Sequence, residues 1–540
     1  MPDATPMSRE LEFPEDRVVG VIYIRPVTDE PPNVTEFGAI TSWNGLAPAT
    51  GRVAVPGAMA VKLRVNRSAA QDLAFLRHLQ PNDLQELDLR FTSLPDEQLA
   101  YLSELVGLER LILRATPVGD TALAHLDSLA NLRLLDLTST HVTDSGLAHL
   151  RHLTALRTLD LSHTGVHGPG LIYLRDLPSL QALYCRNGGI NSEGYANVGE
   201  LKALRSFAIS DSEVNDSALV ALSRCPALED LDLFETSIDD AGLWHLRNMR
   251  LHALDLARTD VTDSGMSYLA HMVTLEDLML ESCDIGDSGL AELDELPIMC
   301  ALHLVGTQVS NAGLAHLAAV HTFRELDLRD TQIDDHGLRH LSQQKSLQSL
   351  FLDRVSDLGL LYLRDLVNLR NLEVLGATVD GDGLTILEDM TALERLRLTY
   401  LQCADDKLTP IRRLRRLQSL ELDDSSVRNT DLRHLDQLHA LRSLELSHTH
   451  IGDDGAPHLA NLGSLRHLGL SKTRISDTGL AILSTLKNLE YLALSDTKVS
   501  DASLRNIAAL PLLQTLYIQG TTISESGRAF LRANLPNCEV

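Results

Sequence analysis

The sequence predicts an α/β solenoid in which short parallel strands line one face and helices line the other. One phrase, L-x-x-L-x-L, begins nineteen times between residue 84 and the C-terminus. Sixteen of the eighteen intervals are 24 residues; the others are 23 (228 to 251) and 22 (347 to 369). Each copy joins a strand-like to a helix-like segment and is too short to bury its own apolar face. Neighbouring copies must therefore stack into one continuous core.

The coil from 132 to 155 shows what each copy contains. Residues 135–137 alternate leucine, aspartate and leucine, which is the period of a strand with its leucines inward and its aspartate on the opposite face. Leu147, Leu150 and Leu153 follow at helical spacing and predict an amphipathic helix with one buried face. Each coil is therefore expected to be strand, turn, helix and return.

Most coils carry an aspartate seven residues after the last strand leucine, and two carry asparagine instead. We expect these side chains to be helix N-caps, which accept hydrogen bonds from unpaired backbone N–H groups. In many coils a glycine follows two residues later, and its missing Cβ is expected to let the helix start approach the adjacent coil. The predicted caps are Asp96, Asp120, Asp144, Asp216, Asp240, Asp263, Asp287, Asn311, Asp335, Asp405, Asn429, Asp453, Asp477 and Asp501.

The turn pattern T-x-[VI]-[TS]-D-x-G-L, seen at residues 140–147, resembles the 24-residue repeats of bacterial leucine-rich-repeat proteins. It is also similar to F-box-associated repeats, although no F-box-like run of helices is present. The resemblance covers roughly residues 60–540 and implies a curved parallel β-sheet on the concave face, helices on the convex face, and partner binding. The familiar turn asparagine is here threonine, which can still bond the turn backbone: Thr92, Thr116, Thr140, Thr164, Thr236, Thr259, Thr307, Thr331, Thr449, Thr473, Thr497 and Thr521.

Residues 1–58 lack the repeat, whereas residues 59–540 are expected to form a solenoid of about twenty coils. Two segments, Val18 to Ile24 and Arg52 to Val65, favour strands, so we expect a small β-rich cap over the first coil. The alternative is a small module that recruits a second protein, which would make the chain an adaptor.

Composition excludes several function classes. The formal net charge of −27 and pI near 5.1 disfavour nucleic acid and anionic membrane surfaces. No segment approaches the ~20 apolar residues of a membrane helix, and no secretory signal is visible. The six cysteines contain no CxxC pair, so we expect reduced thiols and a cytoplasmic location. The oligomeric state stays open.

No catalytic, cofactor-binding or metal-binding residue is predicted, and we expect no enzymatic activity. The histidines recur once per coil on the outer face, without HExxH. The stretch from Gly376 to Gly383 lacks the lysine of a phosphate-binding loop. The basic cluster from Arg412 to Arg416 favours a solvated helix face, with an acidic partner as the alternative. Cys185 and Cys403 take core and turn positions.

The residue between the two strand leucines is the most informative position, because it faces the concave side. Nine of these nineteen residues are acidic, which indicates either a solvated face or a docking surface for a basic protein or peptide. Large apolar groups on the same face are candidate binding anchors. We therefore predict a protein-binding scaffold, with an enzyme as the less favoured alternative. The predicted partner-binding residues are Tyr184, Phe234, Met279, Phe351, Asp136, Asp160, Asp232 and Asp255.

Overall fold

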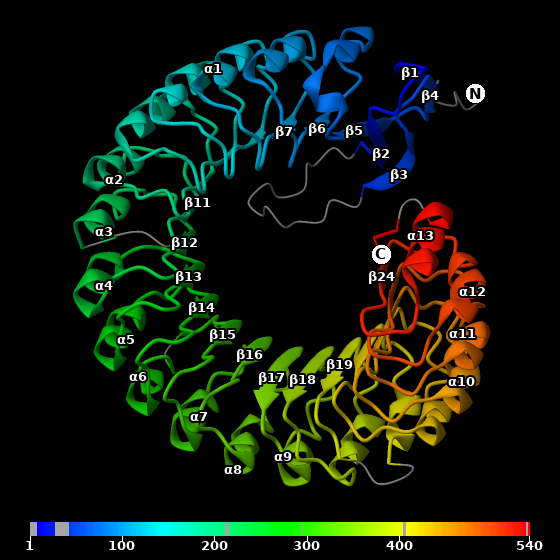
Figure 1. The fold of residues 1–540 in the computed structure, drawn as a ribbon. Coiled ribbons are helices and arrows are strands. Elements are labelled where there is room, and N and C mark those ends of the chain that lie inside the picture. The colour runs from blue at the N-terminus through cyan, green and yellow to red at the C-terminus, as the bar shows by residue number, and fades with distance from the viewer. Residues whose placement is uncertain are drawn as a thin grey trace, which may run out of the picture. The chain divides into compact units, whose positions relative to one another are not determined.

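The computed structural model describes residues 8–27, 43–210, 214, 216–294, 296–402, 407–535 and 538–539. The chain divides into two compact units, residues 1–278 and 279–540. In each unit the strands lie side by side on the inner face and the helices cover the outer face (Figure 1). This arrangement confirms the predicted α/β leucine-rich solenoid within each unit.

The first unit contains one long sheet. Strands β5 to β13 follow chain order, and each is parallel to the next. The strands are β1 (Arg9–Glu12), β2 (Gly20–Pro26), β3 (Asn44–Pro48), β4 (Arg52–Val55), β5 (Met59–Val65), β6 (Glu86–Asp88), β7 (Arg110–Ile112), β8 (Leu134–Asp136), β9 (Thr158–Asp160), β10 (Ala182–Tyr184), β11 (Ser206–Ala208), β12 (Asp230–Asp232) and β13 (Ala253–Asp255). Strand β14 (Asp277–Met279) contains the junction between the units.

The second unit repeats the same pattern, with β15 to β24 parallel in chain order. Its strands are β15 (Ala301–His303), β16 (Glu325–Asp327), β17 (Ser349–Asp353), β18 (Asn371–Leu375), β19 (Arg395–Leu398), β20 (Ser419–Glu421), β21 (Ser443–Glu445), β22 (His467–Gly469), β23 (Tyr491–Ala493) and β24 (Thr515–Tyr517).

The helices are short, and many are single 3-10 turns. In the coil from 132 to 155 the helix is a 3-10 segment, Gly146–His152, and Leu153 follows it; all three predicted helix leucines are fully buried. The α-helices are α1 (Asp120–Leu123), α2 (Ser192–Val198), α3 (Asp216–Leu222), α4 (Asp240–Leu246), α5 (Asp263–Leu269), α6 (Asp287–Ala291), α7 (Asn311–Leu317), α8 (Asp335–Leu338), α9 (Asp357–Tyr362), α10 (Ala456–Ala460), α11 (Asp477–Leu483), α12 (Leu504–Ala508) and α13 (Glu525–Asn534).

The 3-10 helices lie at Ala69–Gln71, Ala74–His78, Asp96–Leu102, Ala124–Leu126, Gly146–His152, Pro169–Asp176, Arg339–Leu341, Gly383–Glu388, Thr409–Arg413, Asn429–His434, Asp453–Gly455 and Asp501–Ser503. Within the described residues, none of the helices is long and apolar enough to cross a membrane.

The N-terminal segment joins the sheet of the first coil. Strand β5 pairs antiparallel with β2 on one side and parallel with β6 on the other. The prediction of one strand from Arg52 to Val65 is wrong, because the chain turns at Ala58, whose φ is +59°. Strand β4 instead pairs with β1, in a separate two-stranded sheet.

The strand exit is fixed by a turn that recurs along the chain. The predicted role of the turn threonines is confirmed: each of the twelve donates its hydroxyl to the carbonyl three residues earlier, at 2.5–2.7 Å. In most coils the residue before this position has a left-handed backbone, as at Ser139, His163 and His448, where φ is 55° to 59°. This conformation costs roughly 1–2 kcal/mol for a non-glycine residue, so the surrounding bonds must hold it.

The repeating aspartate does not cap its own helix, so that prediction is wrong. The helix begins at the aspartate itself, and the residue before it is the N-cap, as Thr262 is for α5 and Ser310 for α7. The carboxylate bonds the next coil instead: Asp287 accepts from the backbone N–H and hydroxyl of Ser310 at 2.8 and 2.7 Å. The sequence places the residue correctly but does not reveal which coil its carboxylate faces.

We call this set of inter-coil bonds the aspartate ladder. It joins Asp120 to Thr143, Asp144 to Gly168 and Gly170, Asp240 to Thr262, Asp287 to Ser310, Asn311 to Asp334, Asp335 to Ser356, Asp357 to Asp380, Asn429 to Gly452, Asp453 to Ser476, Asp477 to Ser500 and Asp501 to Ser524. Asp405 and the side chain of Asp216 lie outside the described residues.

The recurrence of a glycine at the same helix position in many coils follows from the ladder. A Cβ on Gly146 would lie 2.4 Å from Oδ1 of Asp120, and one on Gly313 would lie 2.4 Å from Oδ1 of Asp287. The carboxylate therefore occupies the space that a side chain would need, which confirms the predicted close approach to the adjacent coil.

We expect Asp287→Ala to lower the free energy of unfolding by about 2 kcal/mol, because two bonds to a carboxylate are lost. Burial alone would raise the pKa of Asp287, but the bonds from Ser310 and Gly313 outweigh it and lower the pKa. The carboxylate therefore stabilises the fold above the unfolded pKa of about 4, and this stabilisation is lost as the pH falls through the lowered folded pKa.

Urea unfolding of wild type and variant at pH 7 and under acid conditions measures the effect, which should shrink in acid. Asp287→Asn should cost less than alanine, since asparagine takes this position at Asn311 and Asn429. Asp294→Ala is the control, because Asp294 is exposed in the same coil. Equal destabilisation by both alanine variants would contradict the ladder.

Candidate functional site

The strand-face column consists of the residues between the paired strand leucines, one per coil. In the first unit the register places Asp136 beside Asp160, Asp160 beside Tyr184, and Asp232 beside Asp255. Each is the last residue of its strand. These residues face away from the leucine core, as the alternation of the strand dictates.

Every aspartate of the column has a backbone role that sequence reasoning missed. Its Oδ1 accepts the N–H of the residue two positions later, at 2.8–3.2 Å, just before the left-handed turn residue. This local bond stabilises the turn, as aspartate side chains commonly do. Part of the column's acidity is therefore structural. The six aspartates are Asp88, Asp136, Asp160, Asp232, Asp255 and Asp327.

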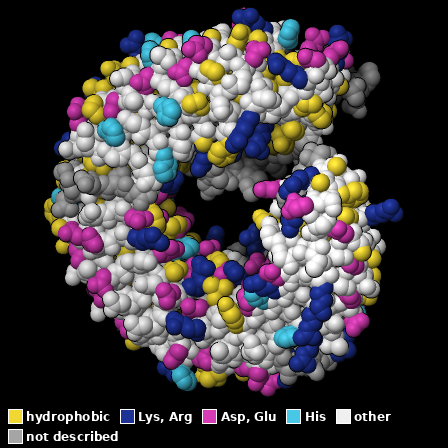
Figure 2. Space-filling model, in the orientation of Figure 1, with side chains coloured by type: hydrophobic (Ala, Val, Ile, Leu, Met, Phe, Trp, Pro, Cys, Tyr) yellow, Lys and Arg dark blue, Asp and Glu magenta, His cyan; other side chains and the backbone are white. Residues whose placement is uncertain are grey.

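Most other carboxylates of the column also contact lysine, arginine or histidine side chains. Arg186 donates Nε and Nη2 to Oδ2 of Asp232 at 3.0 and 2.7 Å, although Arg186 lies two coils earlier. The further pairs are Arg90 with Asp88, Lys62 with Asp88, Arg329 with Asp327 and Glu373, Arg397 with Glu373 and Glu421, and His467 with Glu445. Acidic and basic side chains are accordingly interleaved on the surface in Figure 2.

Asp136 and Asp160 differ from these carboxylates. Among the described residues, no lysine or arginine forms an ion pair with either one, although they are only 4% and 5% exposed. Burial raises the pKa of Asp136, and the neighbouring charge of Asp160 adds to the rise, while bonds from Thr138 and the charge of Arg114 oppose it. Two adjacent carboxylates without a bound cation are costly to bury, so this pair is the strongest candidate for an external cation.

A hollow of about 340 Å³ opens on the strand face beside this pair. Four of the predicted partner-binding residues line it: Asp160, Asp232, Phe234 and Asp255. Sequence reasoning missed its other walls, which come from the turn that follows each strand. Their position, two or three residues after the column residue of each coil, is the signal that would have found them: Arg114, Thr138, Ser162, His163, Arg186, Asn187 and Ser210.

The predicted apolar anchors are only half-exposed. Phe234, Met279 and Phe351 are all intermediate in burial. Arginine guanidinium groups lie over two of the rings, Arg258 at 5.4 Å from Phe234 and Arg329 at 5.2 Å from Phe351. Phe234 stands at the hollow in the first unit, whereas Met279 and Phe351 belong to the second unit.

The expectation that Tyr184 is an exposed anchor is wrong. Tyr184 is 6% exposed and forms a small buried cluster with Ala182 and Ala208. The guanidinium of Arg186 lies 5.3 Å from its ring centroid. The strand register was predicted correctly, but the arginine two residues later covers the ring, so truncation of Tyr184 would disturb the fold as well as any binding.

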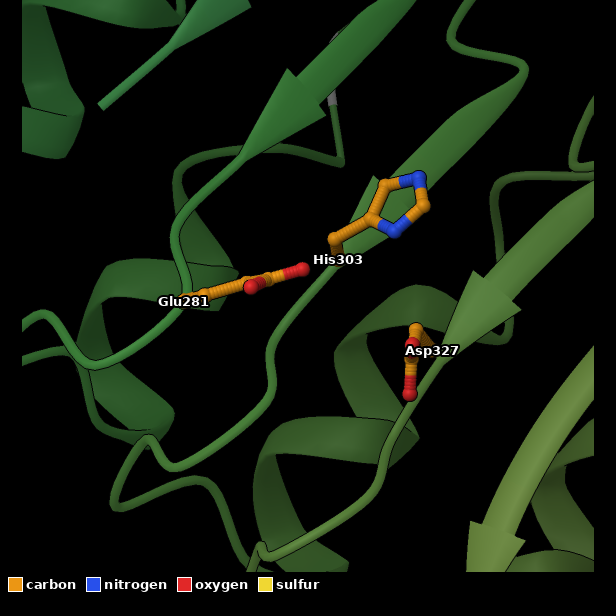
Figure 3. Close-up of side chains that lie close together, drawn as sticks. All are labelled: Glu281, His303 and Asp327. Carbon is orange, nitrogen blue, oxygen red and sulfur yellow. The ribbon is translucent and has the colours of Figure 1, made fainter. Parts of the chain in front are cut away.

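Glu281, His303 and Asp327 bring their possible ligand atoms within 4.8 Å of one another in the second unit (Figure 3). Sequence reasoning did not single out this group. Arg329 donates its backbone N–H and Nε to Oδ1 of Asp327, at 3.2 and 2.9 Å, and its Nη2 to Oδ2 at 2.5 Å. The charge of Glu281 also acts on Arg329. Both oxygens of Asp327 are therefore already occupied by Arg329.

Other sequence features take ordinary places in the coils. The arginines between 412 and 416 are exposed around buried Ile411 and Leu414 on the helix side of their coil. In the glycine-rich stretch, the N–H groups of Asp380 and Gly383 donate to Asp357 of the preceding coil, as part of the ladder. Cys185 is a buried thiol, and Cys403 lies outside the described residues.

Comparison with protein families gives six matches to the Leucine Rich repeat model, at residues 128–150, 152–174, 247–270, 271–293, 321–342 and 437–460. The matched segments coincide with coils of both units. The chain is a leucine-rich-repeat protein. A comparison of the leucine-rich-repeat protein with curated proteins finds no match.

Solved structures with a similar fold include TLR13 from the TLR13-ssRNA13 complex, which is 18% identical over 88% of this chain and 76% of its own, with a TM-score of 0.53. A leucine-rich-repeat protein of Leptospira interrogans is 19% identical over 87% and 98%, with a TM-score of 0.36. The plant peptide hormone receptor RGFR1, solved with RGF2, is 16% identical over 84% and 77%, with a TM-score of 0.41. The likeness to TLR13 concerns the fold alone.

We expect Asp136→Asn to raise the free energy of unfolding at pH 7, measured by urea unfolding, by on the order of 1 kcal/mol, because it removes a buried charge and keeps the acceptor for Thr138. The raised folded pKa means that the cost of ionisation is present at neutral pH and disappears below the unfolded pKa of about 4. The gain should therefore vanish in acid.

Asp88→Asn is the matched control, since Asp88 occupies the same column and is equally buried but pairs with Lys62 and Arg90. It should destabilise the leucine-rich-repeat protein by about 2 kcal/mol, because Arg90 and Lys62, both partly buried, lose a charged acceptor, while Lys62 keeps Glu86. A gain of stability in both variants would show that the ion pairs do not distinguish these positions.

Proposed function

We propose that this leucine-rich-repeat protein is a non-enzymatic scaffold that binds a partner protein on its strand face. The partner presents a basic surface or an extended basic peptide. The observation that supports this most strongly is the buried pair Asp136 and Asp160, which forms no ion pair with a described lysine or arginine. Asp160 lines the hollow in the first unit, and Asp136 lies beside Asp160 in register. Asp232 and Asp255 extend the acidic lining.

The charge of the chain favours a protein over a nucleic acid. TLR13 was solved in a complex with ssRNA13, and its fold is similar. A formal net charge of −27 opposes the approach of a polyanion, whereas it attracts a basic protein and speeds the encounter. We further propose a cytoplasmic location, on the ground that the sequence has cysteines without paired spacing.

We expect Asp136→Asn together with Asp160→Asn to slow association with the partner captured from native cell extract, several-fold at low salt. Added salt should lower the affinity of wild type more than that of the double variant. Phe234→Ala should weaken binding by about 2 kcal/mol, because its ring lines the hollow as an apolar anchor. Surface plasmon resonance measures all three effects.

Asp127→Asn is the control for charge, because Asp127 is exposed on the helix side of the first unit. If the double variant and the control bind alike, and Phe234→Ala also binds as wild type does, the strand face of the first unit is not the docking surface. The helix face, with its arginines at 412–416, is then the surface to test.

An adaptor is the second candidate, in which residues 1–58 recruit another protein. The pairing of β2 with β5, and of β5 with β6, supports a cap instead, because the segment shares the sheet of the first coil. Arg9 also donates to the carbonyl oxygens of Met59 and Asp83 at 3.3 and 3.1 Å.

Deletion of residues 1–58 should therefore expose the first coils rather than remove one partner. We expect faster amide hydrogen exchange in β5 and β6, because β5 loses its antiparallel neighbour. Exchange measured by mass spectrometry tests this. Unchanged exchange together with loss of a single partner would favour the adaptor.

A further inference from the structure

Two coils of the strand-face column show which group binds its carboxylates, namely an arginine guanidinium. Where a column aspartate is followed two residues later by arginine, that arginine closes the site: Arg90 Nε lies 2.8 Å from Oδ1 of Asp88, and Arg329 Nε lies 2.9 Å from Oδ1 of Asp327. The same residue also donates its backbone N–H to the aspartate. One coil therefore supplies both the carboxylate and its guanidinium.

Four of the six column aspartates lack this arginine, and two of the four, Asp136 and Asp160, lie in adjacent coils. Thr138 follows Asp136 and Ser162 follows Asp160, and these small residues are 3% and 4% exposed. They keep the backbone bond to the aspartate, at 3.0 and 2.8 Å. The arginine side chain is missing, and both small residues line the 340 Å³ hollow in its place.

The cations around this hollow do not fill the vacancy. Arg186 directs Nε and Nη2 to a single oxygen of Asp232 and lies over Tyr184. Arg114 is exposed at the rim and forms no ion pair with any described residue. Asp160 therefore faces the hollow with a free share of negative charge, and Asp136 lies directly beside it in register.

We infer that the hollow is a receptor for an arginine side chain of the partner, whose guanidinium takes the position that Arg90 and Arg329 occupy in their own coils. The inference rests on the proposed function and names the group that this face recognises. A planar guanidinium donates along two edges and is weakly hydrated, so it suits two neighbouring, nearly buried carboxylates better than an ammonium does.

The first test uses fluorescein-labelled pentapeptides of alternating glycine and arginine, with lysine and citrulline versions as controls for charge and shape. Fluorescence anisotropy should give an arginine affinity at least about fivefold tighter than that of lysine, and no binding of citrulline. Asp136→Asn with Asp160→Asn should weaken arginine binding at least about tenfold, whereas Asp127→Asn should leave it unchanged.

The second test supplies the missing arginine from the chain itself. Thr138→Arg should abolish binding of the arginine peptide and raise the melting temperature, because its guanidinium reaches Asp136 as Arg90 reaches Asp88. Ser145→Arg adds the same charge at an exposed site on the helix side and should change neither. The melting temperature shows whether the variant folds, so loss of binding by a folded Thr138→Arg protein supports the inference.

The results separate the two proposals. Equal binding of arginine and lysine peptides, weakened alike by Asp136→Asn and Asp160→Asn, would overturn the arginine receptor and leave the acidic docking face standing. Full arginine binding by Thr138→Arg would place the peptide elsewhere and overturn the receptor. Binding of neither peptide would also overturn it, and the scaffold would then be judged by the captured partner alone.

Discussion

The aspartate ladder is the constraint on which the rest of the molecule depends. Leucine burial drives the coils together but does not fix one coil against the next, because apolar contacts have little directionality. The ladder adds a directed bond between most neighbouring coils of the described residues, such as that from Ser310 to Asp287. It also dictates glycine at positions like Gly313 and the hydroxyl residue before the helix. The turn, the helix start and the coil spacing are therefore set together.

The same residue type serves a second purpose on the other side of the coil. Column aspartates use one oxygen to hold the turn after the strand, which leaves the second oxygen to meet other groups. Asp327 shows both functions, because it accepts the backbone N–H of Arg329 in the turn and also pairs with the guanidinium of Arg329. An acidic strand face thus follows partly from how the turn is built. Its binding character depends on which carboxylates lack an arginine.

The period of the sequence predicts the strand, turn and helix of each coil, but it does not predict which groups its polar side chains bond. Thr140 was placed correctly, because its bond is local and reaches only Leu137. Asp144 was assigned to its own helix, although it bonds Gly168 and Gly170 in the next coil. The register of the column is predictable, because it depends only on strand alternation. The exposure of each column side chain is not predictable from the register, because the groups that cover it come from other coils, as Arg186 does for Asp232, 46 residues away.

The division of labour within each column aspartate has an evolutionary consequence. Because the backbone bond needs only the N–H of the residue two positions later, that residue's side chain is free to vary without loss of the turn. Arginine at this position pairs with the carboxylate, whereas threonine or serine leaves the carboxylate without an ion pair. Single substitutions at this position can therefore change which column carboxylates are paired with arginine. The binding specificity of the strand face can change in this way while the fold stays the same.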